Sequence, residues 1–254
     1  MRIVPIYSPS IITNPATDPH DYEPTAADAR TIAGAQMVIE DGIGYDPWAD
    51  RLIAASPASG RAVVNVGDVV GVKPGGNPHQ WYSPTSVNQV IGAIVAAYTK
   101  LDPHDAAYFH RQEMAYETHG LAQYHTLIAT IRRRYHGVAV GASESIFAPL
   151  AQALGLRLLT PTTFLNAISE GTEPTAGDKI AADRQITRKQ IKVWVYNSQN
   201  STPDVSRLTD EARKHGIPVT TITETLAPAN ASFQQWQTRQ LEALATALKQ
   251  ASQR

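Results

Sequence analysis

The stretch Asp102 to Tyr135, DPHDAAYFHRQEMAYETHGLAQYHTLIATIRRRY, decides the architecture that this sequence predicts. Asp102-Pro103 has the form of a helix start, a capping residue followed by proline at the first helical position. Apolar residues then recur at helical spacing: Leu121, Tyr124, Leu127, Ile128 and Ile131. One helix of roughly 30 residues would be about 45 Å long, which exceeds one small lobe. The stretch therefore predicts a helix that links two lobes.

Gly120 leaves an alternative open within this stretch. Glycine costs about 1 kcal/mol inside a helix relative to alanine. Two shorter helices that break near Gly120 are therefore the competing prediction.

On both sides of this stretch, short apolar runs rich in β-branched residues alternate with helix-like segments. The runs are residues 35–40 (AQMVIE), 62–66 (AVVNV), 137–142 (GVAVGA), 191–196 (IKVWVY) and 219–223 (VTTIT). Such alternation is typical of α/β units with parallel strands. We expect an N-terminal α/β lobe over residues 1–102, a linking helix over 103–135 and a C-terminal α/β lobe over 136–254.

Composition excludes several classes of function. The chain of 254 residues has 22 Lys and Arg against 23 Asp and Glu, a net charge of -1, so it offers no basic surface for nucleic acid. It has no cysteine, which excludes thiolate zinc sites, disulfides and thiol nucleophiles. Its first residues, MRIVPIYSPS, do not have the basic leader and apolar core that a signal peptide needs, and no run of about 18 apolar residues occurs.

Two loops place a histidine directly after a proline: DPHDYEP with His20 and NPHQWYSP with His79. Each loop leads into a predicted helix, which could hold a neutral imidazole in the fixed position that a metal site needs. Taken singly, each is an ordinary loop histidine. The remaining histidines lie on the linking stretch or beside turn-forming glycines and are expected at the surface: His104, His110, His119, His125, His136 and His215.

Two glutamates follow predicted strands closely, Glu144 after GVAVGA and Glu224 at the end of VTTIT. Ligand sites in open α/β sheets gather beyond the carboxyl ends of strands. A buried acid there needs a cation or hydrogen-bond donors. The competing interpretations are a helix N-terminal acid for Glu144 and a solvated turn residue for Glu224.

The motifs DPHDYEP and NPHQWYSP, together with SESIFAPLAQALGL and TEPTAGD, resemble the metal-binding receptors of bacterial manganese and zinc ABC importers, the solute-binding cluster A-I. The resemblance covers nearly the whole chain. It implies two α/β lobes joined by one long rigid helix, with a metal buried between the lobes. It further implies an extracytoplasmic, monomeric protein that delivers the ion to a membrane permease and its ATPase, and that is not an enzyme.

By this resemblance, the metal ligands would be His20, His79, Glu144 and Glu224. Two imidazoles and two carboxylates would balance the charge of a divalent ion. Imidazole suits zinc and oxygen suits manganese, so the implied cargo is Zn²⁺ or Mn²⁺, with Fe²⁺ also compatible. Some zinc receptors of the family have a histidine-rich loop; its absence here favours manganese or iron.

The start of the chain departs from the family, because only 19 residues precede His20 and the usual export signal, lipid-attachment cysteine and first strand are missing. We expect a longer natural N-terminus. Three other functions remain open: a metallohydrolase with a two-His, carboxylate site, a metal-stabilised adhesin, and a receptor for an organic solute.

Overall fold

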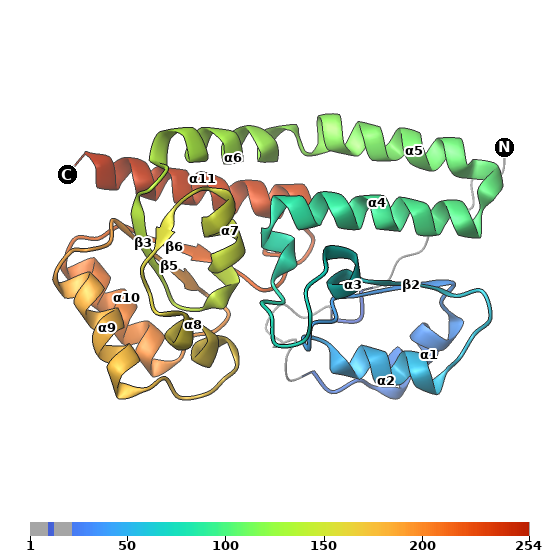
Figure 1. Cartoon of the computed structure of the whole chain (residues 1–254), viewed down its shortest axis with the longest axis horizontal. Helices are drawn as coiled ribbons and strands as arrows, with labels where there is room; N and C mark the ends of the chain where they lie inside the picture. The colour runs from blue at the N-terminus through green and yellow to red at the C-terminus, as the bar shows by residue number, and fades with distance from the viewer. Residues whose placement is uncertain (1–9, 13–21, 254) are drawn as a thin grey trace.

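Two α/β lobes lie side by side beneath a layer of long helices in the computed structural model, which describes residues 10–12 and 22–253 (Figure 1). The N-terminal lobe contains α1 (Ala26–Gly34), β1 (Met37–Glu40), α2 (Pro47–Ala55), β2 (Ala62–Asn65) and α3 (Val66–Val70). The strands β1 and β2 pair in parallel, with Met37 opposite Ala62. The small core beneath them centres on Ile32, Trp48 and Ala49.

The C-terminal lobe has a parallel sheet in the order β4-β3-β5-β6. Its strands are β3 (Ala139–Ala142), β4 (Arg157–Leu158), β5 (Val193–Asn197) and β6 (Val219–Ile222). Its helices are α7 (Ala148–Ala153), α8 (Thr162–Ser169), α9 (Ala176–Thr187), α10 (Pro203–Lys214) and α11 (Phe233–Ser252). All five apolar runs identified in the sequence form strands, which confirms the parallel α/β class.

The helix layer connects the lobes (Figure 1). The first helix, α4 (Pro84–Leu101), begins at Ser83, whose side chain accepts a hydrogen bond from the Ser86 N–H. The linking stretch follows as a 3₁₀ turn η2 (Pro103–Asp105), α5 (Ala106–Ala115), a π-helical turn η3 (Tyr116–Gly120) and α6 (Ala122–Tyr135). Helix α5 packs on α4 and α6 packs on α11, so each half of the link is backed by a helix from one lobe.

The link therefore differs in one detail from a single uninterrupted α-helix, and the interruption falls at Gly120. The Leu121 N–H reaches back to the Tyr116 carbonyl at 2.8 Å, which closes a π turn. The Tyr116 ring covers Gly120, where a Cβ would come within 2.7 Å of the ring. The Tyr116 hydroxyl donates to Gln234 Oε1 of α11 at 3.2 Å. A π turn contains one residue more than an α-helical turn, and here it orients the Tyr116 ring toward the C-terminal lobe.

A matched pair of glycine substitutions tests this explanation. Gly120→Ala is expected to lower the free energy of unfolding by about 1–3 kcal/mol, because the new methyl group collides with the Tyr116 ring. Gly92→Ala in α4 is expected to raise it by about 0.5–1 kcal/mol, because its nearest neighbour lies 3.7 Å away and alanine favours the helix. Urea unfolding of both variants is the measurement, and stabilisation by both would contradict the packing argument.

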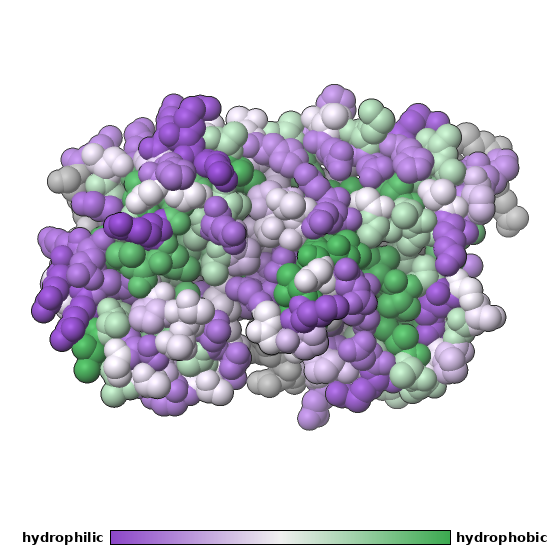
Figure 2. All heavy atoms as spheres, in the orientation of Figure 1, coloured by the Kyte–Doolittle hydropathy of each residue, from purple (hydrophilic) through white to green (hydrophobic). Residues whose placement is uncertain are grey.

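Hydrophilic side chains cover much of the helix layer on the face in Figure 2, and apolar residues reach the surface in places on both lobes. Among the large exposed apolar residues are Ile39 and Val63 of β1 and β2. In the part of the chain that the structure describes, no helix has the length and apolar character needed to cross a membrane.

Candidate metal centre

His79 lies at the junction of the two lobes, fully buried, at the start of the 3₁₀ turn η1 (Gln80–Tyr82) that precedes α4. Its Nε2 atom is 3.3 Å from Oε1 of Glu224 in the C-terminal lobe. The rings of Tyr45 and Trp81 meet the imidazole edge-on, with centroids at 6.1 and 5.3 Å. The packing around His79 thus holds its Nε2 atom beside the carboxylate of Glu224, which is 145 residues away in the sequence.

Asn77 determines which nitrogen of His79 carries the proton. Its Nδ2 donates to the Ser145 carbonyl at 2.7 Å, so its Oδ1 must face His79, whose backbone N–H donates to it at 3.0 Å. The His79 Nδ1 atom lies 2.8 Å from the same oxygen and must therefore donate its hydrogen. In the neutral ring this leaves the lone pair on Nε2, the form that binds metals.

Glu224 follows β6 by two residues, at the carboxyl end of the sheet. Its Oε2 accepts a hydrogen bond from the Tyr45 hydroxyl at 3.2 Å, and Asn197 Nδ2 approaches its Oε1 at 3.4 Å. An imidazole lone pair and a carboxylate oxygen at 3.3 Å repel each other unless a cation lies between them. A metal ion bound between the two side chains would meet that requirement.

Glu144 follows β3 by two residues and is 1% exposed. Its Oε2 accepts a hydrogen bond from Asn200 Nδ2 at 2.9 Å. The next residue, Ser145, is the one whose carbonyl accepts from Asn77, so the loops of Glu144 and His79 are tied directly. Three of the four ligands expected from the sequence therefore belong to loops that converge on one region; His20 lies outside the described residues.

Tyr82 fixes the turn that precedes Glu224. Its hydroxyl, fully buried, lies 2.9 Å from the Thr223 carbonyl oxygen and 2.8 Å from Gln240 Oε1 of α11. Trp236 Nε1 of the same helix donates to Thr223 Oγ1 at 2.7 Å. Because Tyr82 belongs to the turn that His79 opens, these bonds set the spacing between the two loops.

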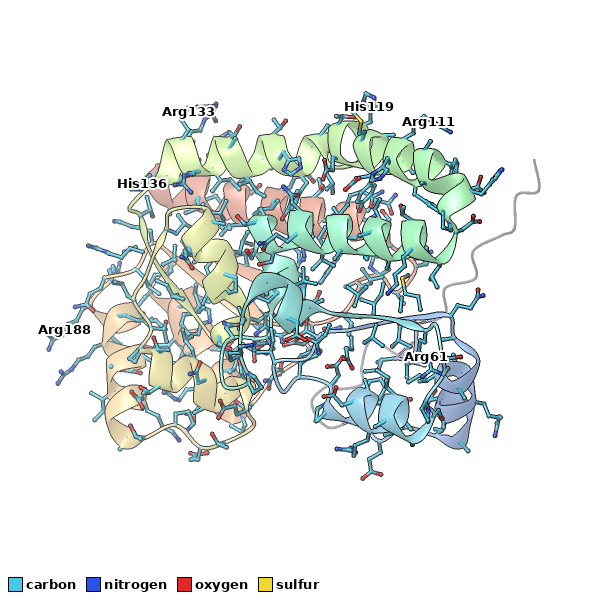
Figure 3. All side chains as sticks on the ribbon, turned by 45° about the vertical axis from the view of Figure 1, so that its right-hand side comes forward. Arg61, Arg111, His119, Arg133, His136 and Arg188 are labelled. Atoms are coloured by element: carbon cyan, nitrogen blue, oxygen red, sulfur yellow. The ribbon has the colours of Figure 1, made fainter. Side chains whose placement is uncertain are left out.

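The histidines expected at the surface are exposed or half-buried in the structure. Figure 3 shows His119 on the outer side of the helix layer and His136 near the end of α6. His215 bonds to Glu211 at 3.0 Å within its own helix region.

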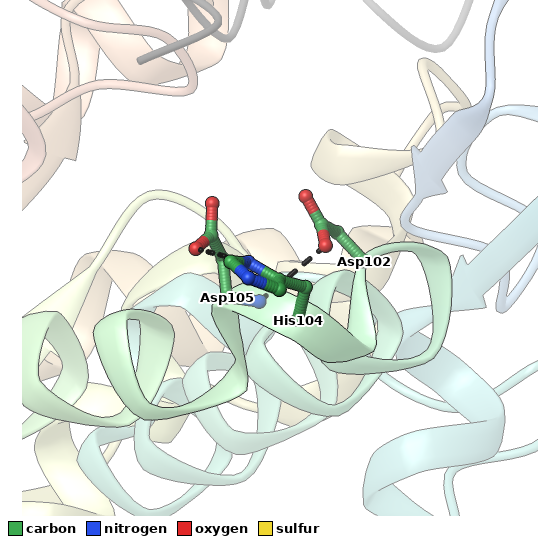
Figure 4. Close-up of side chains that lie close together, drawn as sticks. All are labelled: Asp102, His104 and Asp105. Atoms are coloured by element: carbon green, nitrogen blue, oxygen red, sulfur yellow. Dashed lines mark hydrogen bonds and ion pairs between the residues drawn. The ribbon is translucent and has the colours of Figure 1, made fainter. Parts of the chain in front are cut away.

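A second group of possible ligands, Asp102, His104 and Asp105, lies at the start of the linking stretch (Figure 4). The Asp102 side chain accepts from the Asp105 N–H at 3.4 Å and caps η2, as the sequence predicts. His104 is 94% exposed and contacts Asp105 at 3.2 Å. Exposure to solvent and the capping of η2 explain why these three side chains lie together, so we do not assign a metal site to them.

Several residues of the site were not identified from the sequence: Asn77, Tyr45, Asn197 and Asn200. Asn77 lies two residues before His79 in the same motif, and Asn197 is the last residue of β5. Both could have been found from the sequence, because ligand sites gather near such motifs and at the carboxyl ends of strands. Asn200 and Tyr45 gave no comparable signal.

Asp41, at the end of β1, adds a further acid to this region. Burial, together with the charges of Asp46 and Glu224, raises the pKa of its carboxyl to about 8. Among the described residues its Oδ2 is buried without a hydrogen-bond partner. Asp41 is thus protonated below about pH 8, and the neighbouring carboxylates of Asp46 and Glu224 help to keep it so.

The raised pKa of Asp41 predicts how the metal-free protein responds to pH. The folded state keeps a proton that the unfolded state loses near pH 4, so stability falls as pH rises from about 4 to about 8. We expect a melting temperature lower by roughly 5 °C at pH 8 than at pH 5, and a weaker decrease in Asp41→Asn. Asp210→Asn, at an exposed position of α10, is the control, and identical slopes in all three proteins would contradict the assignment.

Comparison with known proteins places the fold. The manganese-bound periplasmic metal-binding protein of Candidatus Liberibacter asiaticus is 20% identical, with a TM-score of 0.72 over 91% of this chain and 87% of that one. The solute-binding protein FpvC of P. aeruginosa, in complex with Ni²⁺, is 22% identical, with a TM-score of 0.71 over 92% and 86%. These similarities show a shared fold.

Curated relatives match over part of their length. The iron-binding protein YfeA of Yersinia pestis is 27% identical over 58% of this chain and 49% of its own. The zinc uptake protein ZnuA of Bacillus subtilis is 21% identical over 77% and 66%. Finally, residues 6–247 match the family model described as zinc-uptake complex component A, periplasmic, and the chain belongs to that family.

Proposed function

We propose that this protein is an extracytoplasmic receptor that captures a divalent transition metal ion between its two lobes and delivers it to a membrane permease driven by an ATPase. The cargo is Zn²⁺ or Mn²⁺, and Fe²⁺ is compatible with the same donors. The protein acts as a monomer and carries out no covalent step.

The observation that carries this proposal is the pairing of His79 with Glu224. A buried imidazole whose tautomer is fixed by Asn77 points its other nitrogen at a carboxylate of the opposite lobe, 3.3 Å away. Glu144, also buried, contributes a second carboxylate on an adjoining loop. Nitrogen and oxygen donors with net negative charge suit a divalent transition metal. We assign the ligands as His79, Glu144 and Glu224, with His20 as the fourth.

The family and its relatives support a metal as the cargo, since the relatives are described as proteins of iron binding and zinc uptake. The linking helices suit capture with little movement, because α4 and α11 back both halves of the link. Release would then require the permease to displace a ligand loop. The loop of Glu144 is the candidate, since it joins the His79 loop through the Asn77 bond to Ser145.

Elemental analysis of the protein purified without an affinity metal, followed by titration of the metal-free protein with zinc and manganese, tests the proposal. We expect one equivalent of ion per chain. A folded protein that takes up neither ion would overturn it. A bound metal with an open water position and hydrolytic turnover would instead support a metallohydrolase.

A further inference from the structure

Tyr45 joins Glu224 from the opposite lobe. Its side chain is 8% exposed, and its hydroxyl donates to Glu224 Oε2 at 3.2 Å. Its ring packs against the Trp81 ring at a centroid distance of 5.2 Å. These ring contacts hold the Tyr45 side chain in place, so its hydroxyl is positioned at Glu224 Oε2.

The loop that carries Tyr45 is held in an unusual conformation. Gly42, Ile43 and Gly44 all have positive φ, at 67°, 60° and 91°. For a β-branched residue such as Ile43 this is a strained backbone state that persists only where the surroundings impose it. Asp46 imposes it from the C-terminal side, because its carboxylate accepts the N–H groups of Asp41 and Gly42, both at 2.8 Å.

Glu144 is restrained in the same way on the other side of the site. Asn200 Nδ2 donates to its Oε2 at 2.9 Å and also reaches the Ile168 carbonyl at 3.2 Å. Each of the two carboxylates thus has an oxygen that accepts from a side-chain donor at 2.9 or 3.2 Å. Glu224 Oε1, the oxygen beside His79, is approached by Asn197 Nδ2 at the longer distance of 3.4 Å.

We infer that the Tyr45 hydroxyl is a specificity-determining group, which limits Glu224 to one oxygen toward the metal and thereby favours Zn²⁺ over Mn²⁺. Glu224 Oε2 already accepts the Tyr45 hydroxyl at 3.2 Å and is therefore the weaker donor to a cation, so Glu224 binds the metal through Oε1, the oxygen beside His79. Zinc is satisfied by four ligands in a tetrahedron, whereas manganese is suited to more oxygen donors in an octahedron. The inference rests on the proposed function and assigns the preference of the same site.

Tyr45→Phe tests this, with Tyr108→Phe on α5 as a matched control at a more exposed tyrosine. The metal-free proteins are titrated with Zn²⁺ and with Mn²⁺ against a chromophoric chelator. We expect the ratio Kd(Mn)/Kd(Zn) to fall about tenfold in Tyr45→Phe and to stay constant in Tyr108→Phe. Equal weakening of both ions, or a ratio changed less than about twofold, would overturn the inference.

A second measurement separates coordination from general damage to the fold. The visible spectrum of the Co²⁺-loaded protein reports the number of ligands, because four-coordinate cobalt absorbs far more strongly than six-coordinate cobalt. We expect the strong absorption in the unsubstituted protein and a weaker one in Tyr45→Phe; weak absorption in both would overturn the inference. Failure of the unsubstituted protein to bind any ion would instead refute the proposed function.

Discussion

Replacement of His79 by alanine is expected to lower the affinity for Zn²⁺ by more than about 100-fold. Loss of a residue that only supports a metal ligand costs up to about 100-fold, and loss of the ligand itself should cost more. The imidazole is the buried nitrogen donor, and its Nε2 lies 3.3 Å from Glu224 Oε1. Competition with a chelator of known affinity measures the change.

His119→Ala is the control for this variant, since His119 is exposed on the outer side of the helix layer (Figure 3). Its affinity is expected to equal that of the unsubstituted protein. Because His79 is buried, the melting temperature of the metal-free His79→Ala protein must be measured alongside. An affinity within about threefold of normal in a folded His79→Ala protein would contradict the assignment.

Loss of the Asn77 side chain is expected to have the next largest effect, a decrease of about 10- to 100-fold in metal affinity for Asn77→Ala. The amide fixes the His79 tautomer and ties the His79 loop to Ser145, beside Glu144. Without it, the ring can place its hydrogen on Nε2, the atom that faces Glu224.

Nitrogen NMR of the labelled imidazole distinguishes the two tautomers directly. We expect hydrogen on Nδ1 in the unsubstituted metal-free protein at high pH and a mixture in Asn77→Ala. Asn166→Ala, on an exposed position of α8, should change neither the tautomer nor the affinity. A pure Nδ1–H tautomer in Asn77→Ala would show that another group positions the ring.

The strands could be predicted because each is a short β-branched run between helix-like segments. Strand β4 could not, since it consists of Arg157 and Leu158 alone. The break in the linking stretch depends on a contact with α11, where Tyr116 bonds to Gln234, 118 residues away. Local helix propensity marks Gly120 as a weak point, and only the tertiary contact turns it into a π turn.

In the candidate site, too, local patterns predict some residues, and others depend on contacts between distant parts of the chain. His79, Glu144 and Glu224 were reached through motifs and strand ends, and the structure brings the first and last within 3.3 Å. The bond from Tyr45 to Glu224 joins residues 179 positions apart across two lobes. No local pattern encodes such a pair, because it forms only when the loop that carries Tyr45 meets the other lobe. The ligand roles and the lobe boundaries at residues 102 and 136 stay predictions.

Anomalous diffraction from crystals loaded with one equivalent of Zn²⁺ tests the central claim most directly. The account predicts a single strong peak beside Nε2 of His79, with oxygens of Glu144 and Glu224 as further ligands. A peak at the exposed group of Asp102, His104 and Asp105, with none beside His79, would contradict it.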